Sequence, residues 1–160
     1  MIVRQRTLLR IIGMEGGKVS KLRLVKLAFL FQQSAKNAPS SAVYQFLPYQ
    51  FGPYSFTLNH ELRAMERDGW LRMTDTEVAA ARPIKSESEK LEKSLANQID
   101  SLVGGYRKFS TDAIVSEVYE RFPWYTAHAR NIHRRAASVP AAKLSSLHGG
   151  LRRAHARWSS

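Results

Sequence analysis

Residues 49–71 read YQFGPYSFTLNHELRAMERDGWL and place a turn, a capped helix and a helix stop in one passage. Gly52 and Pro53 predict the turn, because glycine tolerates positive φ and proline disfavours helix in the residue before it. Ser55 suits the N-cap of the following helix, since its hydroxyl can accept from a free backbone amide. Gly69 suits the left-handed residue that ends the helix. The passage therefore predicts one helix between a turn and a stop.

The helix predicted over 56–68 has two different faces. Leu58, Leu62 and Met65 fall within a narrow arc of a helical wheel, which is typical of a helix packed on a core. The opposite arc is polar and cationic, and its groups can donate to phosphates and base edges. Two interpretations stay open for it, a nucleic-acid-binding face or an ordinary solvated face. The members of this arc are Asn59, His60, Arg63 and Arg67, with Phe56 from the first turn.

Two short apolar segments, 70–73 and 78–84, flank a polar stretch and predict a small β-hairpin directly after this helix. A helix followed by a hairpin is the order of a winged helix, a variant of the helix-turn-helix in which the helix enters the major groove. The predicted fold is therefore mainly α with a small β-hairpin, and winged-helix-like. Asp75 and Glu77 lie at the hairpin tip and would be repelled by phosphates, so the tip itself is not expected to contact DNA.

Apolar periodicity and cap residues predict further helices around this passage. They are 2–14, 21–33 with Ser20 as N-cap, 87–103 ended by Gly104 and Gly105, and 112–122 stopped by Pro123, with an extended segment at 43–51. The helix at 21–33 is apolar nearly all round, which predicts a central core helix. Its Lys21, Arg23 and Lys26 oppose the helix dipole, so either an anionic partner offsets them or they are ordinary surface cations.

The composition fits one folded domain. The 160 residues are 44% hydrophobic, and we expect a single domain at 1–137 with a basic, mobile tail at 138–160. The absence of cysteine excludes disulfides and thiolate zinc sites. The longest apolar run, 27–31, is far shorter than the roughly 20 residues of a membrane span. A cytoplasmic protein without a membrane partner is expected.

The formal net charge of +12 is concentrated at the two ends of the chain. Residues 1–37 hold eight basic and one acidic side chain, and residues 123–160 hold seven basic and none acidic. Such a field attracts polyanions, with nucleic acid, here duplex DNA, the first candidate, an anionic membrane surface the second and an acidic protein the third. The predicted DNA contacts outside the helix arc are Ser55, Arg72, Arg4, Lys21, Arg23, Arg130, Arg134 and Arg135.

Two segments, KLRLVKLAFLFQQ and FLPYQFGPYSFTLNHELRAMERDGWL, together resemble the Panacea domain, the SocA-like antitoxin and phage-associated family. The chain also resembles a related N-terminal module of some bacterial multidomain proteins. The likeness spans 8–71, with EVYERFPWYT at 117–126 similar to the end of that module, and the family's Tyr-Gly-Pro stands here as Phe51-Gly52-Pro53. The resemblance implies a mostly helical bacterial or phage protein of a conflict or regulatory system, whose relatives neutralise toxins or act as adaptors.

The sequence contains no constellation typical of catalysis, so we expect neither an enzyme nor a cofactor or metal site. There is no phosphate loop, no nucleophile elbow and no His-Glu-x-x-His pattern. Two functions stay open: a DNA-binding module, or an antitoxin or adaptor that binds a toxin or another protein. Aromatic anchors would serve the second function, although the same rings can also belong to the core. They are Phe56 with Tyr44, Phe46, Tyr49, Phe51 and Tyr54.

Overall fold

The structure is a computed structural model of the chain and describes residues 1–35, 39 and 44–126. The described part is mainly helical with a small antiparallel sheet, which confirms that part of the predicted fold class. The tail expected at 138–160, and residues 127–137 at the end of the expected domain, lie outside the described residues. The helices are α1 (Val3–Met14), α2 (Lys21–Ser34), α3 (Phe56–Arg67), α4 (Lys85–Ser88), α5 (Lys93–Tyr106) and α6 (Thr111–Arg121), with a 3-10 helix η2 (Pro123–Thr126).

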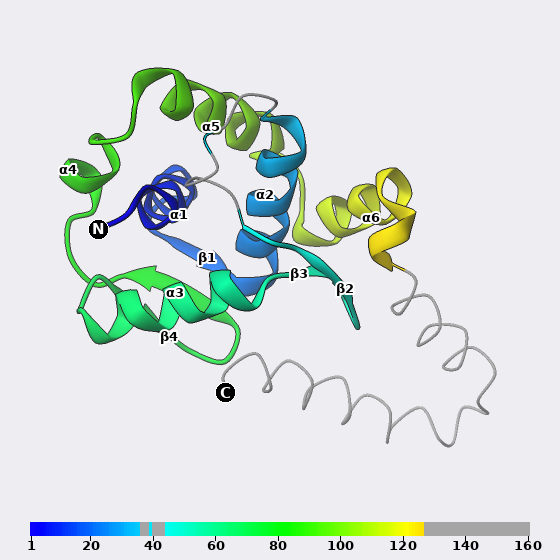
Figure 1. The fold of residues 1–160 in the computed structure, drawn as a ribbon, viewed down its shortest axis with the longest axis horizontal. Helices are drawn as coiled ribbons and strands as arrows, with labels where there is room; N and C mark the ends of the chain where they lie inside the picture. Colours follow the sequence, from blue (N-terminus) through cyan, green and yellow to red (C-terminus); the bar gives the residue numbers. More distant parts are fainter. Residues whose placement is uncertain (36–38, 40–43, 127–160) are drawn as a thin grey trace.

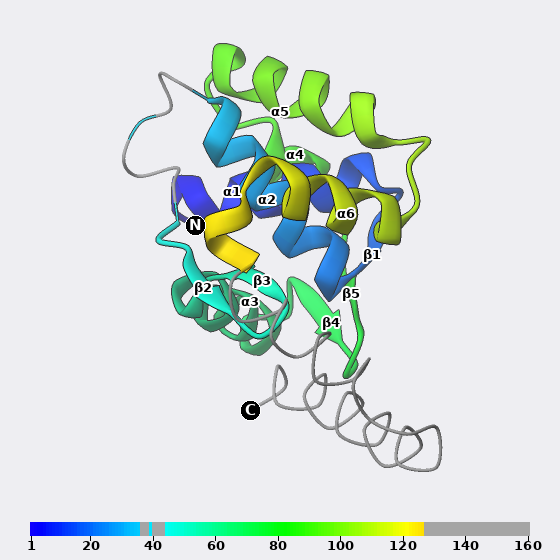
Figure 2. The ribbon, with the colours of Figure 1, turned by 90° about the vertical axis from the view of Figure 1, so that its right-hand side faces the viewer.

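The helices are arranged around α1, which Figure 1 shows nearly end-on. α1 contacts α5, α4, α2 and α3, and in Figure 1 these surround it, with α5 above and α3 below. The inward side chains of α1 are fully buried: Leu8, Leu9, Ile11 and Ile12. α2 is also surrounded, since it packs on α1, α5 and α6. Figure 2 shows α6 lying across α2, with α5 and α3 on opposite sides of the molecule.

A three-stranded sheet joins the region before α2 to the region after α3. It contains β1 (Lys18–Ser20), β5 (Glu77–Ala80) and β4 (Leu71–Met73), in the order β1-β5-β4, and both pairs are antiparallel. Val19 lies opposite Val78, and both side chains are buried. The predicted hairpin at 70–84 is therefore present and is extended by a strand that the sequence did not predict.

A second, two-stranded ribbon precedes α3. β2 (Leu47–Tyr49) pairs antiparallel with β3 (Gly52–Tyr54) around the predicted Gly-Pro turn, and Gly52 has a φ of +86°. A side chain at Gly52 would be strained there, and its Cβ would lie 2.9 Å from the Tyr119 ring. The turn thus requires glycine both for its backbone and for its contact with α6.

α3 forms as its sequence predicts. The Ser55 hydroxyl accepts a hydrogen bond from the Leu58 amide (3.2 Å), and the chain leaves the helix through Gly69 with a φ of +71°. Leu58, Leu62 and Met65 are buried, so the apolar arc does face the core. The hairpin begins directly after this stop.

The segment after the hairpin differs from the prediction of one helix over 87–103. It forms the short α4, then a break, and then α5, whose N-cap is Glu92 with its carboxylate accepting from the Ser94 amide (3.2 Å). Gly104 and Gly105 do not end α5, which continues to Tyr106. The Tyr106 hydroxyl donates to Glu117 of α6 (2.6 Å), and this tertiary contact overrides the low helix propensity of the two glycines.

We expect Leu62→Ala to lower the free energy of unfolding by about 2 to 5 kcal/mol, because it leaves a cavity under α3. Leu62 is only 2% exposed, whereas Arg67 on the same helix is exposed. Arg67→Ala should therefore cost less than about 1 kcal/mol. Urea unfolding of the two variants measures the difference, and equal losses would contradict the orientation of α3.

Candidate nucleic-acid interface

The outward face of α3 combines an aromatic ring with polar and cationic groups. Phe56, His60 and Arg67 are exposed, while Asn59 and Arg63 are half-buried. The two half-buried residues lie on the side of the helix where Glu66 accepts a hydrogen bond from the Met73 amide of β4 (2.9 Å). Arg63 is consequently closer to the hairpin and more sheltered than a wheel alone predicts.

The hairpin adds one exposed cation next to α3. Arg72 lies on β4 between the buried Leu71 and the half-buried Met73, and it is exposed. The turn of the hairpin is acidic, and Glu77 forms an ion pair with Lys18 of β1 (2.9 Å). The strand β4, and not the hairpin tip, therefore continues the cationic surface of α3.

Arg82 stabilises the junction between α3 and β4, a role that the sequence did not predict. Its guanidinium lies 4.2 Å from the Trp70 ring centroid. It also donates to the Gly69 carbonyl (2.7 Å) and to the Asp68 carbonyl, which are the last acceptors around the helix end. Cation–π stacking with carbonyl capping fixes the angle between helix and hairpin.

Lys21 connects the first turn of α2 to the same region. Its backbone amide donates to the Thr76 carbonyl in the hairpin turn (2.8 Å), and the residue is only 5% exposed. Desolvation by burial, and then repulsion from Arg63, lower the pKa of Lys21, whereas Asp75 and Glu66 act to raise it. Lys21 and Arg63 are therefore close enough to repel each other.

Three predicted DNA contacts are engaged inside the protein instead. Ser55 is buried as the N-cap of α3. Arg4 forms an ion pair with Glu61 (2.7 Å) and lies over the Tyr44 ring. We correct the assignment of Ser55, which is buried and stabilises the fold. Arg4 is engaged by Glu61 of α3, and its side chain is 30% exposed.

Arg23 is the third of these residues. It is buried and forms an ion pair with Glu15 (2.6 Å). Its guanidinium also donates to the carbonyls of Phe109 (2.6 Å) and Tyr106 (3.0 Å), at the end of α5. Because these carbonyl groups are distant from Arg23 in the sequence, no local sequence pattern predicts the contacts.

Six of the predicted residues lie on α3, on the adjoining strand β4 or at the start of α2, which is bonded to the hairpin turn. They are Lys21, Asn59, His60, Arg63, Arg67 and Arg72. Arg130, Arg134 and Arg135 lie outside the described residues. This group, which we call the α3 surface, contains four cations and two hydrogen-bonding side chains.

The aromatic cluster divides between core and surface. Tyr44, Phe46 and Tyr54 are buried, as expected of core rings, and burial with the neighbouring Glu61 raises the pKa of Tyr44 well above its usual value. Tyr49 and Phe56 remain exposed, with ring centroids 6.2 Å apart. The exposed pair borders the first turn of α3.

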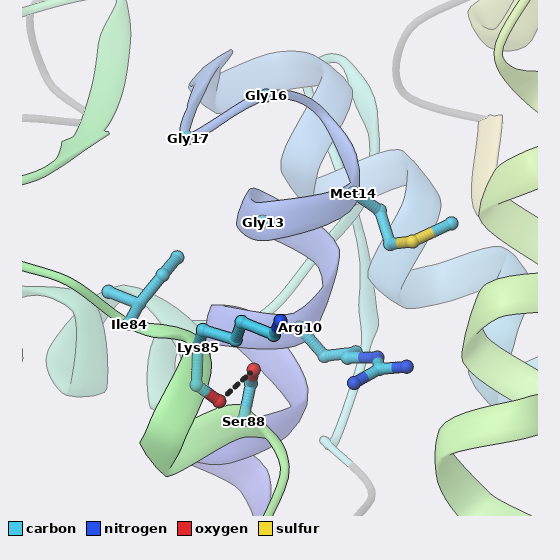
Figure 3. Close-up of a pocket in the computed structure, with 8 residues that line it drawn as sticks. All are labelled: Arg10, Gly13, Met14, Gly16, Gly17, Ile84, Lys85 and Ser88. Atoms are coloured by element: carbon cyan, nitrogen blue, oxygen red, sulfur yellow. Dashed lines mark hydrogen bonds between the residues drawn. The ribbon is translucent and has the colours of Figure 1, made fainter.

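A pocket of about 410 Å³ lies elsewhere, between the end of α1 and α4 (Figure 3). The guanidinium of Arg10 is held by Asp100 (2.7 and 2.5 Å), and the Ser88 hydroxyl donates to the Lys85 carbonyl (2.9 Å). The polar side chains that line the pocket are therefore bonded to other groups of the protein. They do not form a pair placed for acid–base catalysis. The pocket is lined by Arg10, Gly13, Met14, Gly16, Gly17, Ile84, Lys85 and Ser88.

Within the described residues, no group of three or more His, Asp or Glu side chains is arranged to hold a metal ion. In the same residues, no helix combines the length and the apolar character needed to cross a bilayer. Comparison of the chain with protein-family models, with curated proteins and with solved structures gave no significant match.

Proposed function

We propose that the chain is a winged-helix-type module that binds duplex DNA through the α3 surface. The observation that supports this most directly is the placement of α3. Its inner face is buried, its outer face carries His60 and Arg67, and a hairpin with the exposed Arg72 follows it. In a helix-turn-helix variant, a helix of this kind lies in the major groove and the following strands lie along the backbone.

The order of the elements supports the same proposal. A strand between the first two helices pairs with the second strand of the hairpin, so that α1, β1, α2, α3, β4 and β5 follow one another with β5 central in the sheet. This is the order of a winged helix, here with the β2–β3 ribbon inserted between α2 and α3. The resemblance to the Panacea family, whose members act in regulatory and conflict systems, is compatible with such a module and is part of the proposal.

The four cations of the α3 surface set the expected salt dependence. If Lys21, Arg63, Arg67 and Arg72 together neutralise three or four phosphates, log K should fall with log salt at a slope of about −3 to −4, before any contribution from other residues. Fluorescence anisotropy of the full chain with labelled duplex DNA at several salt concentrations measures this slope. No binding at low salt would end the proposal.

Arg67→Ala separates reading of bases from general attraction. If Arg67 contacts a base edge, the variant should lose about 1 to 3 kcal/mol of binding and also its sequence preference in selection from a random duplex pool. Lys93→Ala is the control, because Lys93 is also an exposed cation and begins α5, which lies on the side of α1 away from α3 in both views (Figures 1 and 2). If both variants keep affinity and preference, α3 is not the reading helix.

A protein partner is the second candidate, and the exposed aromatic pair favours it. Phe56 is 60% exposed, which is high for a phenylalanine, and Tyr49 lies beside it. Phe56→Ser should abolish capture of a protein partner while leaving the salt slope on DNA unchanged. Purified protein that carries no nucleic acid and binds no duplex, but retains a partner lost on Phe56→Ser, would favour this candidate.

A further inference from the structure

The guanidinium of Arg63 is unusual among the described residues. Its Nε and Nη2 are the only buried side-chain nitrogen or oxygen atoms there without a hydrogen-bond partner. A buried charged donor without an acceptor is costly, and such a group in a folded protein calls for an explanation. Nε–H and Nη2–H point in the same direction and together form the edge of the guanidinium that binds carboxylate or phosphate through two parallel hydrogen bonds.

Among the residues that the structure describes, Lys21 is a second buried cation without an acidic partner. It is nearly buried, and in the described residues no carboxylate lies within ion-pair distance of its ammonium. The nearest acidic groups, Asp75 and Glu66, act on its pKa only through the field. Glu66 is in turn bonded to the Met73 amide, which holds its carboxylate at β4.

The two cations are held against the same hairpin from two sides. The backbone of Lys21 is bonded to Thr76 in the hairpin turn, and Arg63 lies one helical turn before Glu66, which is bonded to Met73 in β4. The amides of Lys21 and Arg23 at the start of α2 are already occupied, by the Thr76 carbonyl and the Ser20 hydroxyl. The two side chains are therefore the cationic donors available to an anion at this junction.

We propose that Lys21 and Arg63 form an anion site for one phosphate group, between the start of α2, the middle of α3 and the β4–β5 hairpin. A phosphate accepts two hydrogen bonds from the Nε–Nη2 edge of Arg63 and one from the Lys21 ammonium, which removes the unpaired donors and the repulsion between the two cations. Arg63 as a whole is half-buried, although this edge is buried in the structure. In the proposed bound state, a change of the Arg63 rotamer turns the edge toward Lys21 and solvent. The assignment of this phosphate to the backbone of duplex DNA rests on the proposed function.

The site itself is tested without DNA. Thermal unfolding of the full chain in sodium phosphate should occur about 3 to 6 °C higher than in sodium chloride of equal ionic strength, because a ligand of the folded state raises its stability. Arg63→Gln and Lys21→Gln should each lose most of this difference, whereas Lys93→Gln, at the exposed start of α5, should keep it. Comparison with the control variant removes the general effect of phosphate on protein stability. Equal differences in wild type, control and both site variants would overturn the proposal.

Arg63→Met provides an independent test of the anion site. It removes the unpaired buried donors, so the variant should unfold at a higher temperature than wild type in chloride but at the same temperature or lower in phosphate. A local packing role for the guanidinium would instead lower the unfolding temperature in both salts, and that result would overturn the proposal.

Duplex DNA distinguishes the source of the phosphate. The double variant Lys21→Gln with Arg63→Gln should weaken binding about 5- to 10-fold, alike for all sequences, and reduce the magnitude of the salt slope by about 1. Phosphate protection without any DNA binding would keep the anion site and end the proposed function. DNA binding that Lys21→Gln and Arg63→Gln leave unchanged, together with no specific phosphate protection, would end the anion site and keep the proposed function.

Discussion

Lys26→Met should remove most of the rise in stability that we expect for the wild type between pH 7 and pH 9.5. Lys26 is fully buried in α2, and its ammonium donates to the carbonyls of Phe51 (2.7 Å) and Pro53 (3.1 Å). Desolvation by burial lowers the pKa of Lys26 from 10.5 to about 7. The lysine thus links α2 to the turn of the β2–β3 ribbon and is hard to keep charged there.

The lowered pKa of Lys26 determines the direction in which stability changes with pH. Between pH 7 and 10.5 the unfolded chain binds a proton at Lys26 that the folded chain has released, so stability rises with pH in this window and falls as the pH approaches 7. The gain between pH 7 and 9.5 is about 3 kcal/mol for a shift of this size. Lys21, whose pKa is also lowered, adds a rise of the same sign that the variant keeps.

The tyrosines set the upper limit of the window. Burial, with the carboxylate of Glu117, raises the pKa of Tyr106 to about 12, and burial also raises the pKa of Tyr44 and Tyr119. These groups stay protonated in the folded state while the unfolded chain ionises near pH 10, so they lower stability only above about pH 10. Measurements below pH 9.5 therefore exclude the effect of the tyrosines, and the comparison with Lys26→Met identifies the contribution of Lys26.

Urea unfolding at pH 7, 8 and 9 provides the measurement. The control is Lys93→Met, an exposed position at the start of α5. Wild type and control should gain stability together over this range, and Lys26→Met should keep only the smaller rise that comes from Lys21. Parallel curves for all three proteins would mean that Lys26 is not the group that titrates.

The elements around α3 could be predicted because their signals are local. The Gly-Pro turn, the Ser55 cap, the apolar arc and the Gly69 stop all lie within one passage, and the structure confirms each. The break before α5 could not be predicted, because Leu91 continues the apolar spacing of the helix while Glu92 forms a separate cap. Here a side chain, and not the periodicity, determines where the helix begins.

The burial of cations could not be predicted from periodicity. The apolar periodicity of residues 2–14 leaves Arg4, Arg6 and Arg10 outside the apolar face of α1, but each meets a carboxylate from a distant element: Glu61, Glu87 and Asp100. In α2 the cations oppose the helix dipole, and the compensating groups are carbonyls and one carboxylate from other segments. From composition alone, all the cations of α1 and α2 would be taken as surface charges. Only the tertiary contacts show which of them remain available to a partner. The α3 surface is smaller than the basic sequence suggests for this reason.

Arg23→Met should lower the free energy of unfolding by about 3 to 5 kcal/mol, the largest loss that we expect from one side chain in this protein. The guanidinium binds Glu15 through two hydrogen bonds (2.6 and 3.2 Å) and two carbonyls at the end of α5, all in a nearly dry environment. Removing the cation leaves the Glu15 carboxylate buried without its partner. Arg121→Met is the matched control, because its ion pair with Glu117 is largely exposed and should contribute less than about 1 kcal/mol.

The double variant Arg23→Met with Glu15→Leu separates the ion pair from the carbonyl contacts. If the stranded carboxylate causes most of the loss, the double variant should recover a large part of it, because an apolar pair avoids the unpaired charge. If the double variant is as unstable as the sum of the two single variants, the carbonyls of Tyr106 and Phe109 are the important acceptors. Arg23 would then act mainly by joining the end of α5 to α2, and urea unfolding of the four proteins as a double-mutant cycle decides between these roles.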